Sequence, residues 1–144
     1  MPIPEAMQIQ VSYQRLLEAM TALSRHICNG RADPRWTQEL GRLLQTFCDR
    51  LTTHYQLLDF DAELQEVEQR APRLHEKLVN LQREARLIQR EATALLRDFD
   101  PQKTRVPTAL IDRIRTLLKW IEDHEARKNR VVLDAFYTEV GAVD

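Results

Sequence analysis

Apolar side chains recur along four long segments of this chain in alternating steps of three and four residues. That spacing places them on one face of an α-helix, because about 3.6 residues complete a turn. The four apolar seams run through Ile9, Tyr13, Leu16, Met20, Leu23 and Ile27; through Leu40, Leu44, Phe47, Leu51, His54 and Leu58; through Leu74, Leu78, Leu81, Ala85, Ile88, Ala92 and Leu95; and through Leu110, Ile114, Leu117, Ile121, His124, Lys128, Val131 and Ala135. Four amphipathic helices with short connections predict an all-α fold, an antiparallel up-down-up-down four-helix bundle that forms a single domain over residues 1–144.

Turn-forming residues separate the four segments. Asp33 and Pro34 suit the N-cap and the first turn of the second helix. Residues 62–70 lie between an Asp-rich break and a proline, so we expect a short joining helix there. The last helix is expected to open near Pro107 and to end at Gly141, because glycine commonly closes a helix.

Composition narrows the classes of function. With 21 lysines and arginines against 22 aspartates and glutamates, the chain lacks the clustered positive charge of a nucleic-acid-binding protein. No apolar run approaches the length of a membrane span, and the N-terminus lacks the pattern of a signal peptide. We therefore expect a soluble, cytoplasmic protein with Cys28 and Cys48 as free thiols and with no membrane or nucleic-acid partner. No motif for phosphate binding or nucleophilic catalysis stands out, so no enzymatic activity is expected.

Polar residues interrupt the seams. His54 lies in the second seam, and His124 and Lys128 lie in the fourth, where the pattern calls for apolar side chains. A buried polar group needs a partner. At a rise of about 1.5 Å per residue, Tyr13, His54, Ala85 and His124 all lie about 25 Å from the same end of an antiparallel bundle. We therefore expect these four residues to share one layer of the core.

Three stretches carry a resemblance to a known family. Residues 124–129 (HEARKN) are similar to a His-Glu-x-x-Glu-Asn run, and the tail to residue 144 continues that likeness. Residues 54–55 (HY) before the Asp-rich break are similar to His-Phe-x-x-Glu-Glu, and residues 81–85 (LQREA) are similar to Leu-x-x-Glu-His. On these motifs the chain resembles the hemerythrin-like (HHE cation-binding) family, bacterial members included, over nearly its whole length. The resemblance implies a bundle whose relatives hold a di-iron centre between the helices.

The resemblance also implies that two histidine ligands are missing. The helix-one histidine of the family corresponds to Tyr13, with Gln14 as the alternative. The helix-three histidine corresponds to Ala85, although the preceding Glu84 is kept. A different alignment would use His75 as the helix-three ligand, but His75 lies in the first turn of its helix.

The other two histidines are kept without their carboxylates. His54 and His124 match family ligands, but the glutamates expected one turn later are replaced by Leu58 and Lys128. Bridging carboxylates neutralise and hold the two iron ions in such centres. We therefore expect no di-iron centre and no reversible binding of oxygen.

Two interpretations of the remaining polar layer stay open. In the first interpretation, His54 and His124 are buried in the core, and their ring nitrogens are hydrogen-bonded to each other, to Tyr13 or to water. Alternatively, His54, His124 and the Tyr13 phenolate hold a single zinc or iron ion. The second interpretation would make the protein a residual metal-binding or gas- or redox-responsive sensor.

The expected function follows from the loss of ligands within a retained fold. We expect a non-catalytic interaction or regulatory module without a cofactor, which binds another protein or associates with itself. Lys128 is expected to line the core with its stem and either turn its ammonium outward or pair with Glu84 or Asp59. Alternatively, its charge fills the volume that the metal occupies in the family. Both interpretations disfavour a metal cation nearby.

Overall fold

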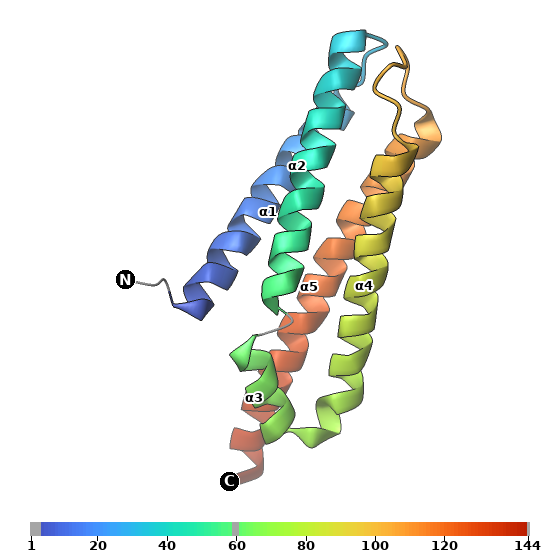
Figure 1. The fold of residues 1–144 in the computed structure, drawn as a ribbon. Coiled ribbons are helices and arrows are strands. Elements are labelled where there is room, and N and C mark those ends of the chain that lie inside the picture. Colours follow the sequence, from blue (N-terminus) through green and yellow to red (C-terminus); the bar gives the residue numbers. More distant parts are fainter. Residues whose placement is uncertain (1–3, 59–60, 144) are drawn as a thin grey trace.

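A computed structural model describes residues 4–58 and 61–143, with side chains described as far as Tyr137. Figure 1 shows the helices, which are α1 (Glu5–Cys28), α2 (Pro34–Leu58), α3 (Ala62–Arg70), the single 3-10 turn η1 (Pro72–Leu74), α4 (His75–Asp98) and α5 (Thr108–Val143). Within those ranges the chain contains no strand. The predicted all-α class is therefore confirmed, and so is the short joining helix.

Side chains and prolines set most helix ends. A carboxylate oxygen of Asp33 accepts a backbone N–H in the first turn of α2 at 2.8 Å, and Asp61 does the same for α3 at 3.0 Å. α5 begins directly after Pro107. The predicted end at Gly141 is wrong, because α5 continues to Val143. Glycine closes a helix by adopting a left-handed conformation, and no glycine in the described ranges has a positive φ.

The long helices pack in pairs (Figure 1). α1 and α2 lie side by side along most of their length, and α4 and α5 form a second pair. Consecutive long helices run in opposite directions, with α1 and α4 rising in the view of Figure 1 and α2 and α5 descending. Contacts between α2 and α4 join the pairs, whereas α1 touches α5 only lightly. The short α3 lies near the lower end and packs mainly against α5.

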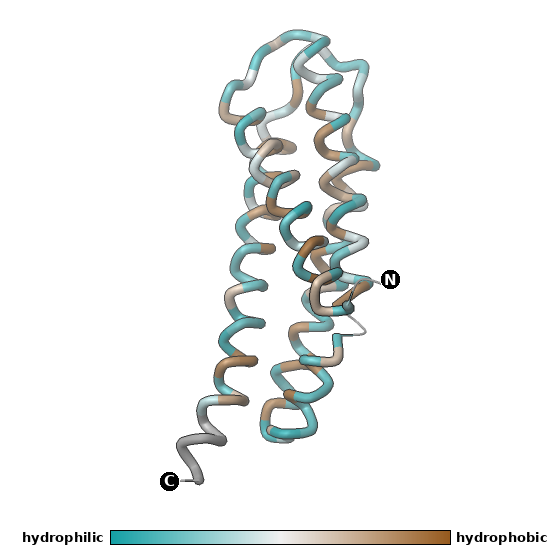
Figure 2. Tube along the Cα trace, turned by 90° about the vertical axis from the view of Figure 1, so that its left-hand side faces the viewer, coloured by the Kyte–Doolittle hydropathy of each residue, from teal (hydrophilic) through white to brown (hydrophobic). Residues whose placement is uncertain are grey.

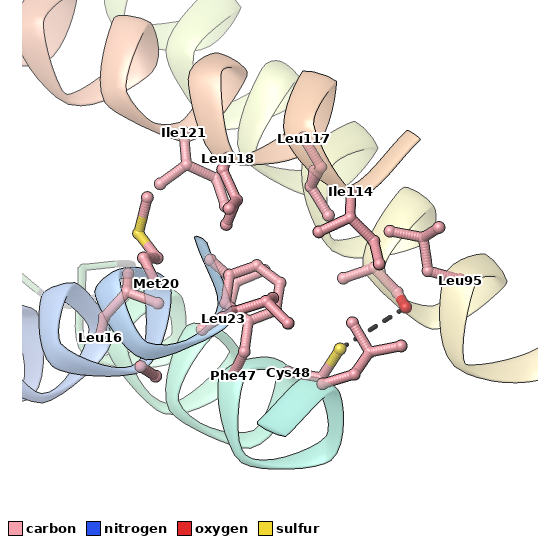
Figure 3. Close-up of a cluster of buried hydrophobic side chains, with 14 of the residues drawn as sticks. Leu16, Met20, Leu23, Phe47, Cys48, Leu95, Ile114, Leu117, Leu118 and Ile121 are labelled. Atoms are coloured by element: carbon pink, nitrogen blue, oxygen red, sulfur yellow. Dashed lines mark hydrogen bonds between the residues drawn. The ribbon is translucent and has the colours of Figure 1, made fainter. Parts of the chain in front are cut away.

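The main core fills the space between the two helix pairs (Figure 3). Leu16 and Leu23 of α1 and Phe47 of α2 are fully buried, and Ile114 of α5 is almost so. Burying such a side chain contributes about 1.5–3 kcal/mol, so this cluster is the main source of stability. The buried Cys48 thiol lies in the same cluster and donates to the carbonyl oxygen of Ala92 at 3.6 Å.

A smaller core lies at the α3 end of the molecule. Its buried members are Val67, Ala71, Leu74, Leu78, Val131 and Ala135.

Apolar and polar residues alternate along each helix in Figure 2, as expected for helices with one buried face. No helix in the part of the chain that the structure describes has both the length and the apolar character needed to cross a membrane.

Candidate functional site

Four aromatic side chains form what we call the imidazole–tyrosine layer. Tyr13 comes from α1, His54 and Tyr55 come from α2, and His124 comes from α5. The ring centroids are 5.3 Å apart for Tyr13 and His54, 5.9 Å for His54 and Tyr55, and 5.6 Å for Tyr55 and His124. Only 1% of His54 and 3% of His124 is exposed. The structure thus brings Tyr13, His54 and His124 into one layer, with Tyr55 between the two histidines.

The hydrogen bonds of His54 fix its tautomer. Ser12 Oγ lies 2.8 Å from His54 Nδ1, and the same hydroxyl donates to the carbonyl oxygen of Ile9 at 2.8 Å. A serine hydroxyl has one proton, so it can only accept from His54. Nδ1 therefore carries the hydrogen, and Nε2 presents a lone pair. Within the described ranges this buried Nε2 has no hydrogen-bond partner.

His124 is held in the opposite tautomer. Its Nε2 lies 2.9 Å from the carbonyl oxygen of Leu81, which can only accept a hydrogen bond, so Nε2 carries the hydrogen. Nδ1 then accepts from the Tyr55 hydroxyl across a long 3.4 Å contact. The expected bond between the two histidines, or from either of them to Tyr13, is not what orients the rings. Ser12, Tyr55 and a backbone carbonyl do so instead.

Burial disfavours the charged forms of His54, Tyr55 and Tyr13. Desolvation, with smaller effects from Lys128 and His124, lowers the pKa of His54 to about 4. Burial also raises the pKa of Tyr55 well above its ordinary value, and burial together with Glu125 and Glu122 raises that of Tyr13. At pH 7 His54 is therefore uncharged and both phenols keep their protons.

Lys128 pairs within its own helix. Its Nζ lies 2.9 Å from Oε1 of Glu125, and only 13% of each side chain is exposed. The predicted partner Glu84 instead accepts from Trp120 Nε1 at 2.8 Å and binds the Arg127 guanidinium. The prediction of a Lys128–Glu84 pair is therefore wrong, because Arg127 reaches α4 from the adjacent position on α5. Asp59, the other predicted partner, lies outside the described residues.

A cavity of about 70 Å³ opens beside the layer. Its walls come from α2, α3, α4 and α5 and the residue before α3, namely Tyr55, Leu58, Asp61, Leu64, Gln65, Glu68, Leu78, Leu81, Gln82, Ala85, His124 and Lys128. Leu58, Ala85, His124 and Lys128 are four of the six positions at which the family resemblance implies metal ligands; the other two, Tyr13 and His54, do not line the cavity. All four line this one cavity, although they come from three different helices.

The alternative ligand positions lie elsewhere. Gln14 is exposed, whereas its neighbour Tyr13 is half-buried with its ring close to His54. His75 is exposed at the start of α4 and pairs with Glu68. The structure therefore associates Tyr13, and neither Gln14 nor His75, with the layer.

The donors present do not fit a di-iron centre. Bundle di-iron sites use several inward-facing carboxylates, whereas Leu58 and Lys128 occupy the corresponding positions here. Among the side chains that the structure describes, in residues 4–58 and 61–137, no group of three or more His, Cys, Asp and Glu is placed to hold a metal ion. What the layer does offer is the free Nε2 of His54 and the weakly engaged Nδ1 of His124.

Sequence reasoning missed Ser12 and Tyr55. Each lies directly beside a seam residue, Ser12 before Tyr13 and Tyr55 after His54. Ser12 also precedes the seam residue Leu16 by one helical turn, which places it on the same face. That spacing is the signal that could have marked Ser12 as inward-facing.

Comparisons with known proteins do not test the resemblance to hemerythrin-like proteins. The hemerythrin-like resemblance rests on short motifs and on the arrangement of Leu58, Ala85, His124 and Lys128 around one cavity. It therefore stays a hypothesis. The chain matches no family model, no curated protein and no solved structure.

Proposed function

We propose that this chain is a hemerythrin-like, up-down-up-down four-helix bundle that has lost its metal centre and acts in the cytoplasm as a non-catalytic interaction or regulatory module. The observation that carries the proposal is the shared cavity. Leu58 of α2, Ala85 of α4, and His124 and Lys128 of α5 all line the space beside the imidazole–tyrosine layer. The alignment selects seam positions at one height of the bundle, and their convergence on one cavity agrees with it.

The chemistry of that space supports a regulatory rather than a metal-dependent role. Lys128 contributes an ammonium group where the family would supply a carboxylate, and its pair with Glu125 engages the nearest acid on the same helix. A further cation placed there would be repelled by Lys128 and would compete with it for Glu125. His54 is neutral but sits in a layer whose phenols hold their protons.

Metal analysis of the purified protein tests the proposal. The protein is prepared without chelator or nickel resin, and its iron and zinc contents are measured per chain. We expect well under stoichiometric metal and a melting temperature that added iron or zinc leaves unchanged, since a ligand of the native state must raise stability. Stoichiometric iron with a charge-transfer absorbance would overturn the proposal.

A second candidate function is favoured by one specific observation. Both histidine rings are oriented by hydrogen bonds from their outer nitrogens, as metal-binding histidines usually are, and His54 Nε2 has no partner in the described ranges. A mononuclear sensor site would use His54, His124 and Tyr13.

A zinc titration separates the two functions. For a sensor, zinc raises the melting temperature of the wild type and of the surface variant His75→Gln but not of His54→Gln. For the non-catalytic module, zinc leaves all three proteins unchanged.

A further inference from the structure

The cavity beside the layer has a polar inner end and an apolar body. Tyr55 and His124 are each only 3% exposed, and both line it. Lys128 joins them with most of its side chain buried. The apolar walls are Leu58, Leu64, Leu78, Leu81 and Ala85. Such a combination of apolar walls with a few converging polar groups is typical of small-molecule sites.

The size of the cavity limits the occupant. Its volume of about 70 Å³ is the space open to the centres of water-sized spheres. One water needs roughly 10–15 Å³ on that measure, so the cavity has room for about five to seven waters, which is comparable to one small ring. A single six-membered ring with one substituent fits this limit.

The charges around the cavity favour a neutral occupant. Lys128 is the cationic group on the wall, and Glu125 neutralises it at 2.9 Å. Asp61 and Glu68 line the cavity as well, and Glu68 also pairs with His75. Asp61 in turn accepts the backbone N–H of Glu63 at 3.0 Å, so each charged group on the wall already has a partner and none is left to pair with a charged occupant. Burying a charged occupant without a dedicated partner is costly.

The inner polar groups favour one hydroxyl on that occupant. The Tyr55 hydroxyl uses its proton toward His124 Nδ1, which leaves its oxygen able to accept a hydrogen bond. The Lys128 ammonium has three N–H groups and needs only one for Glu125. A ligand hydroxyl can therefore donate to Tyr55 and accept from Lys128.

We propose that this cavity binds a small neutral phenol- or alcohol-type molecule. The ring of this molecule lies in the leucine-lined body of the cavity, and its hydroxyl points toward Tyr55 and Lys128. The proposal deepens and rests on the regulatory role proposed above, since the ligand occupies the space left by the lost metal. The two failures are distinguishable. A metal-free protein that ignores phenol refutes the ligand and leaves the lost metal centre standing, whereas a metal-loaded protein refutes the lost centre and the ligand site that depends on it.

The experiment is a titration of the full chain with three probes of similar size. Phenol, benzoate and benzylammonium are each added at pH 7, and binding is followed by amide NMR shifts. We expect saturable phenol shifts at Tyr55, Leu81 and Ala85, with benzoate and benzylammonium binding roughly tenfold more weakly or worse. The proposal fails if 10 mM phenol produces no saturable shift at these residues, or if either charged probe binds as tightly as phenol.

Two substitutions locate the binding. Ala85→Leu fills the cavity and should abolish phenol binding, whereas Ala94→Leu makes the same change on α4 at a half-buried position outside it. Tyr55→Phe keeps the ring but removes the hydroxyl, so phenol should bind roughly fivefold more weakly while toluene binding is unchanged. Equal phenol affinity in wild type and Tyr55→Phe would overturn the proposed orientation even if Ala85→Leu failed to fold.

Discussion

At the scale of single residues, His54 is the most informative position in the chain. Its seam position predicts burial, and only 1% of the residue is exposed. Its Nδ1–H is satisfied by Ser12, which in turn donates to a backbone carbonyl. The sequence could not identify Ser12 as the partner of His54. A seam shows which face of a helix is buried, but not which residue of the neighbouring helix lies opposite a given side chain.

Ser12→Ala tests the contribution of the hydrogen bond between Ser12 and His54 to stability. The substitution leaves the buried Nδ1–H of His54 without an acceptor, which should cost about 1–3 kcal/mol of unfolding free energy. Ser24→Ala is the matched control, because Ser24 is exposed on the same helix. Urea denaturation gives both values, and equal effects of the two substitutions would contradict a role of this bond in stability.

The depressed pKa of His54 predicts a pH-dependent stability. The folded-state pKa is about 4, below the ordinary value of 6.5, so the unfolded chain binds the proton more readily. Stability from this group is complete above about pH 6.5 and is lost as the pH falls toward 4. We expect a loss of about 2 kcal/mol between pH 7 and pH 5 from His54.

Urea denaturation at both pH values measures that loss. His54→Leu should reduce the dependence on pH by this amount, while the surface variant His75→Gln should keep it. An unchanged slope in His54→Leu would show that His54 is not the titrating group.

At the scale of elements, α4 and α5 are joined by a half-buried polar contact. Glu84 of α4 accepts from Trp120 Nε1 at 2.8 Å and pairs with Arg127, both on α5. Only 16% of the Glu84 side chain is exposed, compared with 34% for Glu91, which pairs with Arg113 between the same helices. Removing the acceptor from the more buried contact should therefore cost more unfolding free energy.

Glu84→Ala should therefore destabilise the protein more than Glu91→Ala. The first leaves the Trp120 N–H and the Arg127 guanidinium without their acceptor and should cost about 1–3 kcal/mol. The second removes a more exposed pair, Glu91 with Arg113, and should cost less than about 1 kcal/mol. Thermal unfolding of the two variants ranks them, and the opposite order would refute the assigned importance of Glu84.

Most elements were predictable, but several of their contacts were not. Periodicity identifies the helices because burial of one face is encoded by spacing, and Asp33 and Pro107 mark helix starts through local chemistry. The end at Gly141 was mispredicted, because a glycine can also continue a helix at a cost of about 1 kcal/mol. The partners of Lys128 and Glu84 depend on which neighbouring side chain reaches across to α4, and spacing along one helix does not determine that.

At the scale of the whole molecule, the imidazole–tyrosine layer is continuous with the main core. Tyr55 belongs to the same buried cluster as Phe47 and Tyr13 packs against that cluster, whereas the cavity beside the layer is also lined by α3. Stability comes chiefly from the apolar core. Substitutions in the polar layer should therefore alter the chemistry of the interior with the smallest loss of folding stability.

The most direct test of a lost metal centre is to restore its ligands. The restored variant combines Leu58→Glu, Ala85→His and Lys128→Glu, and its matched control combines Leu133→Glu, Ala94→His and Lys119→Glu at positions outside the cavity. Iron bound per chain is measured after anaerobic loading with ferrous iron and removal of the excess. We predict stoichiometric iron in the restored variant and none in the control or the wild type. A folded restored variant that binds no iron, or a wild type that binds it stoichiometrically, would contradict the account.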